Sequence, residues 1–194
     1  MPKRDPDHMA AQRTRILRAT IECIAARGVE GTSIAEICRL AGLSTGALYV
    51  HFRNRDDILA ETVRYASSAT QDFPDDWPSF KAKAVSFEDM HGFDLVTVMR
   101  VRMHLHAEFV RAGLLHDVFR PLLENTLSAL ARHLQKMHDS GSVALRFSAR
   151  QTAVSISAYI DGMVWIALAS DRPLEELRPE LSAGLDALVL PAGN

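Results

Sequence analysis

Three expected helix starts hold the side chains most able to bind an anionic partner. Ser33-Ile-Ala-Glu36 fits a capping box, in which the Ser33 hydroxyl accepts a hydrogen bond from a free backbone N–H and Glu36 reaches back to the cap residue. Ser44 can cap a second helix, and a further helix opens with the basic run Arg53-Asn54-Arg55. Helix N-termini and guanidinium groups both bind phosphate oxygens. The basic helix start therefore predicts binding to a nucleic acid backbone.

The residues around these caps are spaced as two short helices joined by a tight turn. Apolar residues recur at helical spacing after the first cap, so the first helix has one face to bury. Gly42 falls where a helix commonly ends in a left-handed residue. Leu48 and Phe52, one turn apart, give the second helix an inward face. The stretch from Ser33 to Phe52 is thus predicted to be a helix-turn-helix, which enters the DNA major groove.

Three runs in fixed order carry a resemblance to a known family. They are Gly28-Val-Glu-Gly-Thr-Ser-Ile-Ala-Glu-Ile37, Ala41-Gly-Leu-Ser44 and Leu48-Tyr-Val-His-Phe-Arg-Asn-Arg-Asp-Asp-Ile-Leu59. Together they resemble the N-terminal DNA-binding domain of the tetracycline-repressor (TetR) family. The resemblance covers residues 10–65. Beyond them the chain is similar to the family only in length, in helical pattern and in the helix around Ile160-Asp-Gly-Met163.

The resemblance implies two sets of DNA-binding residues. Those expected to hold the phosphate backbone are Ser33, Ser44, His51 and Arg55. Those expected against base edges are Thr45, Gly46 and Tyr49. The chain departs from the family pattern in carrying Arg rather than Lys at position 55, and in having no Arg, Gln, Asn or Lys between positions 44 and 52. Bidentate base contacts, worth ~1–3 kcal/mol each, are therefore expected to be scarce, and DNA shape is expected to contribute to recognition.

The charge of the chain is unevenly distributed. Residues 1–64 hold ten Lys and Arg and eight Asp and Glu, a balance of +2, whereas residues 65–194 hold twelve and sixteen, a balance of −4. The whole chain has a net charge of −2, which argues against a protein that binds nucleic acid over its entire surface. A basic excess confined to the part with the motif is typical of a localised DNA footprint.

Composition indicates an ordinary globular protein. Apolar residues make up 47% of the chain, and no apolar run approaches the ~20 residues that a membrane helix needs. The N-terminal residues lack the hydrophobic stretch of a secretory signal. Cys23 and Cys38 are expected to be reduced, buried thiols. We therefore expect a cytoplasmic protein that makes no contact with a membrane.

Helical periodicity dominates the whole chain, and no β-type alternation competes with it. The prediction is an all-α protein with a three-helix DNA-binding domain at residues 1–65 and a helical effector-binding and dimerisation domain at residues 66–194. Phe73-Pro-Asp-Asp-Trp-Pro78 is a helix-breaking segment near this boundary. The expected helices cover residues 7–27, 34–41, 44–52, 54–70, 79–87, 93–112, 115–139, 148–170 and 174–190.

The C-terminal helices suggest a homodimer. A recognition helix this short reads few base pairs, and two copies ~34–36 Å apart would double the site and favour a palindromic operator. Two apolar helices from each copy can form a self-complementary four-helix interface. We expect this interface within residues 148–190, without specifying which face of the 148–170 helix forms it.

The interior of the C-terminal part is the candidate site for a small-molecule effector. Pockets between helices are mostly apolar with a few polar groups, and methionines give them adaptable walls. The residues that offer this mix are Met99, Met103, His106, Phe109, Tyr159, Met163 and Trp165. Each of them can also be an ordinary core residue, so both readings stay open.

The function expected from these features is a transcriptional repressor that an apolar or amphipathic effector releases from its operator. One alternative is an activator or a non-catalytic interaction protein with the same N-terminal DNA-binding domain (the head). An all-helical enzyme is another. No glycine-rich phosphate loop, nucleophile elbow or paired-cysteine motif supports an enzyme. No metal or cofactor is expected either, since His104 and His106 lie on different faces of a helix and no cysteine joins them.

Overall fold

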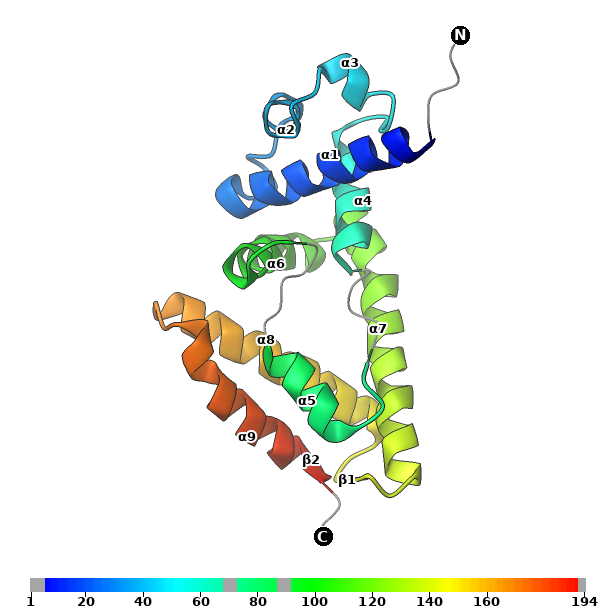
Figure 1. Ribbon diagram of the computed structural model, residues 1–194, viewed down its shortest axis with the longest axis vertical. Helices are drawn as coiled ribbons and strands as arrows, with labels where there is room; N and C mark the ends of the chain where they lie inside the picture. Colours follow the sequence, from blue (N-terminus) through cyan, green and yellow to red (C-terminus); the bar gives the residue numbers. More distant parts are fainter. Residues whose placement is uncertain (1–5, 68–72, 87–91, 192–194) are drawn as a thin grey trace. The chain divides into compact units, whose positions relative to one another are not determined.

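The computed structural model describes residues 6–67, 73–86 and 92–191 (Figure 1). Its α-helices are α1 (Pro6–Arg27), α2 (Ile34–Ala41), α3 (Thr45–Leu48), α4 (Arg55–Ser67), α5 (Trp77–Ser86), α6 (Leu95–Phe109), α7 (Leu114–Asp139), α8 (Ala149–Ala169) and α9 (Arg178–Leu188). The other regular elements are a 3₁₀ turn (Leu174–Leu177) and the strands β1 (Val143–Leu145) and β2 (Val189–Pro191). The predicted all-α class is confirmed. The expected extension of the fourth helix to residue 70 lies outside the described residues.

The C-terminal end differs from the prediction of one helix over residues 174–190. Leu174–Leu177 forms a 3₁₀ turn, and α9 then begins at Arg178 with a proline in its first turn. Proline suits a helix start because its missing N–H would have no partner there. After α9, Val189–Pro191 pairs antiparallel with Val143–Leu145, a short pairing that the helical periodicity did not predict.

The chain groups into two compact units, which we describe separately. The first unit is Met1–Ser68 with Met90–Pro121, and the second is Ala69–Asp89 with Leu122–Asn194. Residues 90–121 therefore belong with the predicted DNA-binding head, and α7 begins in one unit and ends in the other. The boundary between residues 65 and 66 stays a prediction.

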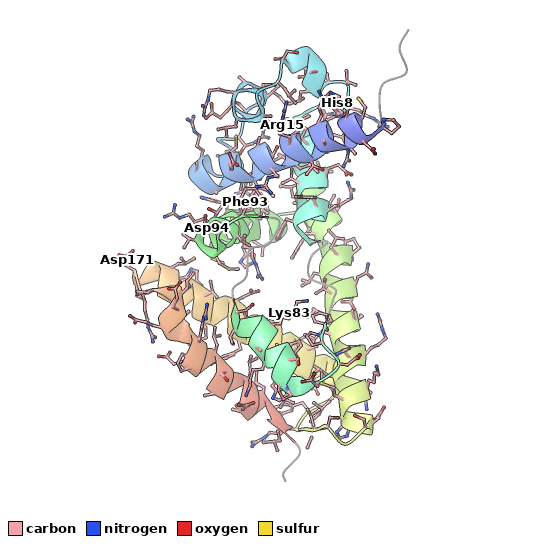
Figure 2. All side chains as sticks on the ribbon, viewed as in Figure 1. His8, Arg15, Lys83, Phe93, Asp94 and Asp171 are labelled. Carbon is pink, nitrogen blue, oxygen red and sulfur yellow. The ribbon has the colours of Figure 1, made fainter. Side chains whose placement is uncertain are left out.

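In the first unit, α1 packs against α2, α4 and α6 (Figure 1). The core contains Ile16, Leu17, Ala19, Cys23, Ile37, Cys38, Ala41, Leu48, Phe52 and Ile58. Both cysteines are free and buried, as predicted, and burial raises the pKa of the Cys23 thiol. The residues before α6, where Figure 2 labels Phe93 and Asp94, are held to α1 by Arg18. Its guanidinium lies 4.6 Å from the centre of the Phe93 ring and donates to the Gly92 carbonyl at 3.3 Å.

In the second unit, α9 packs against both α5 and α8. The core residues are Trp77, Phe80, Leu130, Leu134, Met137, Val143, Ala149, Ala153, Ile156, Leu185 and Val189. Asp186 of α9 accepts hydrogen bonds from the Trp77 indole at 2.9 Å and from the Lys81 ammonium at 2.6 Å, which joins α5 to α9. The Tyr159 hydroxyl of α8 donates to the Glu180 carbonyl of α9 at 2.8 Å.

Helix α8 has two apolar faces. Thr152, Ala153, Ile156, Val164 and Ala167 are buried, whereas Val154, Ala158, Trp165 and Ala169 form an exposed stripe at helical spacing. Among the described residues, α8 alone is long and apolar enough to span a membrane, with 28% of its most apolar window buried. A single helix that meets this test does not indicate a membrane protein.

Candidate nucleic-acid interface

Only one of the two hydrogen bonds of the predicted capping box forms at the start of α2. The Ser33 hydroxyl accepts a hydrogen bond from the Glu36 backbone N–H at 3.2 Å. The Glu36 carboxylate does not complete the predicted capping box. It accepts hydrogen bonds from Arg39 at 2.9 and 2.7 Å and forms an ion pair with Arg27 at 3.2 Å. These arginines, Arg39 first, hold the pKa of Glu36 below its usual value. Glu36 binds these arginines rather than the backbone N–H of Ser33, because guanidinium groups bind a carboxylate more strongly than a neutral amide does.

The turn between α2 and α3 has the geometry that the sequence predicts. Gly42 adopts the left-handed conformation, with φ of 60°, and the Leu43 N–H donates to the Cys38 carbonyl at 3.0 Å. The Ser44 hydroxyl then accepts from the Ala47 N–H at 3.2 Å and caps α3. This α-helix ends at Leu48 rather than at residue 52, and a turn follows it.

The short α3 buries one side and exposes the residues expected to touch bases. Leu48 is fully buried and Phe52 nearly so, which anchors this segment to the core of the first unit. Thr45 and Gly46 are exposed, and Tyr49 keeps 50% of its surface in solvent. A side chain at Gly46 would meet only the Ser44 hydroxyl, 4.0 Å away, so another backbone or base can approach there closely. Thr45, Gly46 and Tyr49 therefore form a small exposed surface, which we call the tip of α3.

The four residues expected at phosphates differ in their surroundings. Ser33 and Ser44 are exposed helix caps, whereas His51 and Arg55 are half-buried and already have protein partners. The His51 ring nitrogen Nε2 lies 3.1 Å from the Gln12 side-chain oxygen. The Gln12 amide nitrogen in turn lies 3.0 Å from a ring nitrogen of His8, near the N-terminal end of α1 (Figure 2). This chain of contacts orients His51, and sequence spacing could not have shown it.

Comparisons with known proteins agree on the class of this head. Residues 16–62 match the family model described as bacterial regulatory proteins of the tetR family. The chain is 26% identical to the HTH-type transcriptional regulator BetI of Escherichia coli over 183 residues, which cover 86% of this chain and 87% of BetI. Residues 16–62 form a DNA-binding domain of the tetR type. The chain is accordingly a DNA-binding transcriptional regulator.

Solved structures share the fold of this chain over nearly its whole length. A TetR-family transcriptional regulator from a Rhodococcus species has a TM-score of 0.78 at 21% identity, covering 92% of this chain and 98% of that one. A transcriptional regulator from Saccharomonospora viridis, solved in complex with choline, has a TM-score of 0.74 at 20% identity, covering 93% of this chain and 98% of that one.

The residues expected in an effector pocket fall on two helices. Met99, Met103, His106 and Phe109 lie on α6 in the first unit, and Tyr159, Met163 and Trp165 lie on α8 in the second. Met99 is buried, Trp165 is exposed, and the Tyr159 hydroxyl is bonded to α9. Phe109 stacks on Phe119 with ring centres 3.7 Å apart. The pocket itself stays a prediction.

An ion pair joins α1 to α4 in the DNA-binding domain. Arg13 binds the Glu61 carboxylate, and its guanidinium lies 5.1 Å from the centre of the Phe52 ring. Arg64 also donates to Glu61, at 2.6 Å. The hydrogen bond from Arg13, followed by its charge and by Arg64, holds the pKa of Glu61 below its ordinary value of 4.5. This carboxylate therefore stabilises the folded head when it is ionised.

This ion pair predicts a pH-dependent stability. Because the pKa of Glu61 is lower in the folded state, its contribution is fully present above pH 4.5 and is lost as the pH falls through the folded-state pKa. We expect Glu61→Gln to lower the free energy of unfolding by about 1 kcal/mol at pH 7, and the difference from the wild type to shrink as the pH falls below 4.5. Urea unfolding at several pH values measures this difference in the free energy of unfolding. Glu22→Gln, at an exposed position of α1, is the control, and equal pH profiles for the two variants would refute the prediction.

Proposed function

We propose that this regulator is a repressor that binds a palindromic operator as a homodimer and leaves it when a small effector binds. The observation that carries the proposal is the exposed tip of α3, where Thr45, Gly46 and Tyr49 face solvent beside two capped helix starts. Ser33 and Ser44 would bind phosphates on either side of the groove, and His51 would add a contact oriented by Gln12. The three tip residues would lie against base edges.

A shift titration with DNA from the regulator's own intergenic region tests the proposal. Sequence-preferring binding by dimeric protein at moderate salt is expected. Deletion of the gene should raise transcription of the adjoining genes. A fall in that transcription would instead favour an activator with the same head. The named relatives are regulators, which supports a non-enzymatic role, and we propose that the protein acts in the cytoplasm.

The exposed stripe of α8 supports a dimer. Val154 and Trp165 keep 44% and 56% of their surface exposed in the single chain, and small alanines lie between and beyond them. An apolar stripe of this kind on a regulatory protein suits a self-complementary contact with the same helix of a second copy. Such a contact would bring two reading heads to one operator.

A charge placed in this stripe is expected to break the dimer. Val154→Glu would bury an unpaired carboxylate between two copies, so the variant should sediment as a monomer at micromolar concentration and bind the operator at least about tenfold more weakly. Analytical ultracentrifugation measures the first effect. Val110→Glu, at a valine that is 86% exposed after α6, serves as the control and should remain dimeric. If the Val154→Glu protein remained dimeric, the dimer interface would have to lie elsewhere than on this stripe.

For the effector, we propose a small apolar or amphipathic molecule bound within the helices that follow the head. The regulator from Saccharomonospora viridis has the same fold and holds choline, which supports a small organic ligand for this fold. Thermal unfolding in the presence of candidate ligands tests the proposal, because a molecule that binds only the folded state raises the melting temperature. A true effector should in addition change the affinity for the operator.

A further inference from the structure

One member of the proposed DNA-facing set has its donors directed at the protein itself. Arg55, the first residue of α4, donates from Nε to the Thr32 carbonyl at 2.5 Å and from a terminal nitrogen to the Val29 carbonyl. Both carbonyls belong to the loop between α1 and α2, more than twenty residues earlier in the chain. Arg53, only two residues away, is exposed, and its guanidinium has no partner in the described part of the chain. The two arginines of the basic run therefore have different surroundings.

The loop that Arg55 holds is tightly built. The Thr32 hydroxyl donates to the Gly28 carbonyl at 2.8 Å, and the Thr32 N–H donates to the Val29 carbonyl at 3.2 Å. Val29 and Thr32 are both buried. A Cβ atom on Gly31 would lie 2.8 Å from the Cβ of Arg27, so the loop lies directly against the end of α1. Removing the guanidinium would leave carbonyls of this loop without their charged donor, which is costly for partly buried groups.

This loop leads directly into the reading head. Thr32 precedes Ser33, whose hydroxyl caps α2, and Asn54, whose side chain caps α4 at the Asp57 N–H, precedes Arg55. The Arg55 bonds therefore join two adjacent helix starts. A planar guanidinium suits this task because its donors can reach two carbonyls at once, whereas the ammonium of lysine is a single point of charge.

We propose that Arg55 is a positioning residue, which fixes the start of α2 relative to the start of α4, and is not a ligand of DNA phosphate. The proposal rests on the proposed function, since it concerns how the head is held for binding DNA. It implies that Arg55 supports affinity through Ser33 and α2, while its own charge contributes no counterion release.

The first test needs no DNA. Arg55→Met and its matched control, Arg53→Met, each remove one positive charge from the same short run. Hydrogen exchange of the full-length protein is then measured at the amides of Thr32, Glu36 and Ile37, which are hydrogen-bonded within or next to the loop. Arg55→Met should speed exchange at these amides about tenfold, and Arg53→Met should leave them unchanged. Wild-type exchange in Arg55→Met would overturn the proposal.

The second test separates positioning from phosphate binding. Operator affinity of both variants is measured by fluorescence anisotropy over a range of KCl concentrations. Each lost phosphate contact lowers the slope of log K against log salt by ~0.9. Arg55→Met should bind about tenfold more weakly with the wild-type slope. A slope reduced by about two in the dimer, one contact for each head, would instead make Arg55 a phosphate ligand and refute the proposal.

Arg55→Lys keeps the proposal testable if Arg55→Met fails to fold. Lysine preserves the charge but not the planar arrangement of donors, so faster loop exchange and weaker binding at an unchanged slope are expected. Wild-type exchange and affinity in this variant would count against the proposal. Failure of the wild-type protein to select any DNA sequence would refute the proposed function alone, since the exchange comparison would still show whether Arg55 holds the loop.

Discussion

Replacing Tyr49 with alanine is expected to weaken operator binding close to a hundredfold. Tyr49 is half-exposed at the end of α3, beside a fully buried Leu48 that fixes its position. Its ring is the largest apolar surface on the predicted base-reading tip. A base contact of this kind is worth roughly 1–2 kcal/mol in each half-site, and a dimer loses it twice. Anisotropy titrations with operator DNA at fixed salt give the difference in Kd.

Two further variants show whether the loss belongs to this ring. Tyr49→Phe keeps the apolar surface and should retain most of the affinity. Val110→Ala removes an exposed apolar side chain after α6, which lies on the other side of α1 from α3 within the first unit (Figure 1), and should bind like the wild type. Far-UV circular dichroism should be unchanged in all three proteins. Wild-type affinity in Tyr49→Ala would mean that bases are read by other residues.

Replacing Gly184 with alanine is expected to destabilise the second unit by about 3 kcal/mol, the upper end of the usual cost of overpacking. The Tyr159 side chain of α8 lies directly on α9, and its hydroxyl bonds to the Glu180 carbonyl one turn before Gly184. A Cβ on Gly184 would come within 2.6 Å of the Tyr159 ring carbon Cε1 and closer still to Cζ and the hydroxyl oxygen. Because α9 is packed on two sides, it cannot retreat without opening the core. Chemical unfolding measures the loss.

The matched control is a second helical glycine. A Cβ on Gly162 of α8 meets no described atom of the single chain within 4 Å. Both glycine variants are therefore compared in the Val154→Glu background, which removes the proposed α8 contact between copies, and there Gly162→Ala should raise the free energy of unfolding by about 0.5–1 kcal/mol through helix propensity. The double variant Tyr159→Ala/Gly184→Ala should lose less stability than the sum of the single changes, because the clash disappears with the ring. A Gly184→Ala protein as stable as the wild type would show that α8 and α9 are farther apart than described.

Local features of the head were predictable from the sequence because each depends on neighbouring residues. The caps at Ser33 and Ser44, the left-handed Gly42 and the buried Leu48 follow from turn and helix chemistry that acts within four residues. The predicted hydrogen-bond partner of Glu36 was wrong for a related reason. The capping pattern names one donor for Glu36, the backbone N–H of the cap residue, and it does not weigh the competing charges of nearby arginines.

Long-range contacts were not predictable in the same way. The bonds of Arg55 to the α1–α2 loop, the pairing of Arg13 with Glu61 and the packing of α6 on α1 all join residues far apart in the chain. Hydrophobic periodicity identifies the face that each helix buries but not the helix that covers it. The strands β1 and β2 are three residues each, too short to show an alternating pattern.

The proposed function depends most on two copies of the DNA-binding domain binding one duplex together. Hydroxyl-radical footprinting of the wild-type protein on its operator tests this directly. Two protected windows related by two-fold symmetry are predicted, with centres about 10 base pairs or a multiple of that distance apart, and inserting half a helical turn between them should abolish tight binding. A single protected window, or binding that tolerates the insertion, would contradict binding by two heads to one operator.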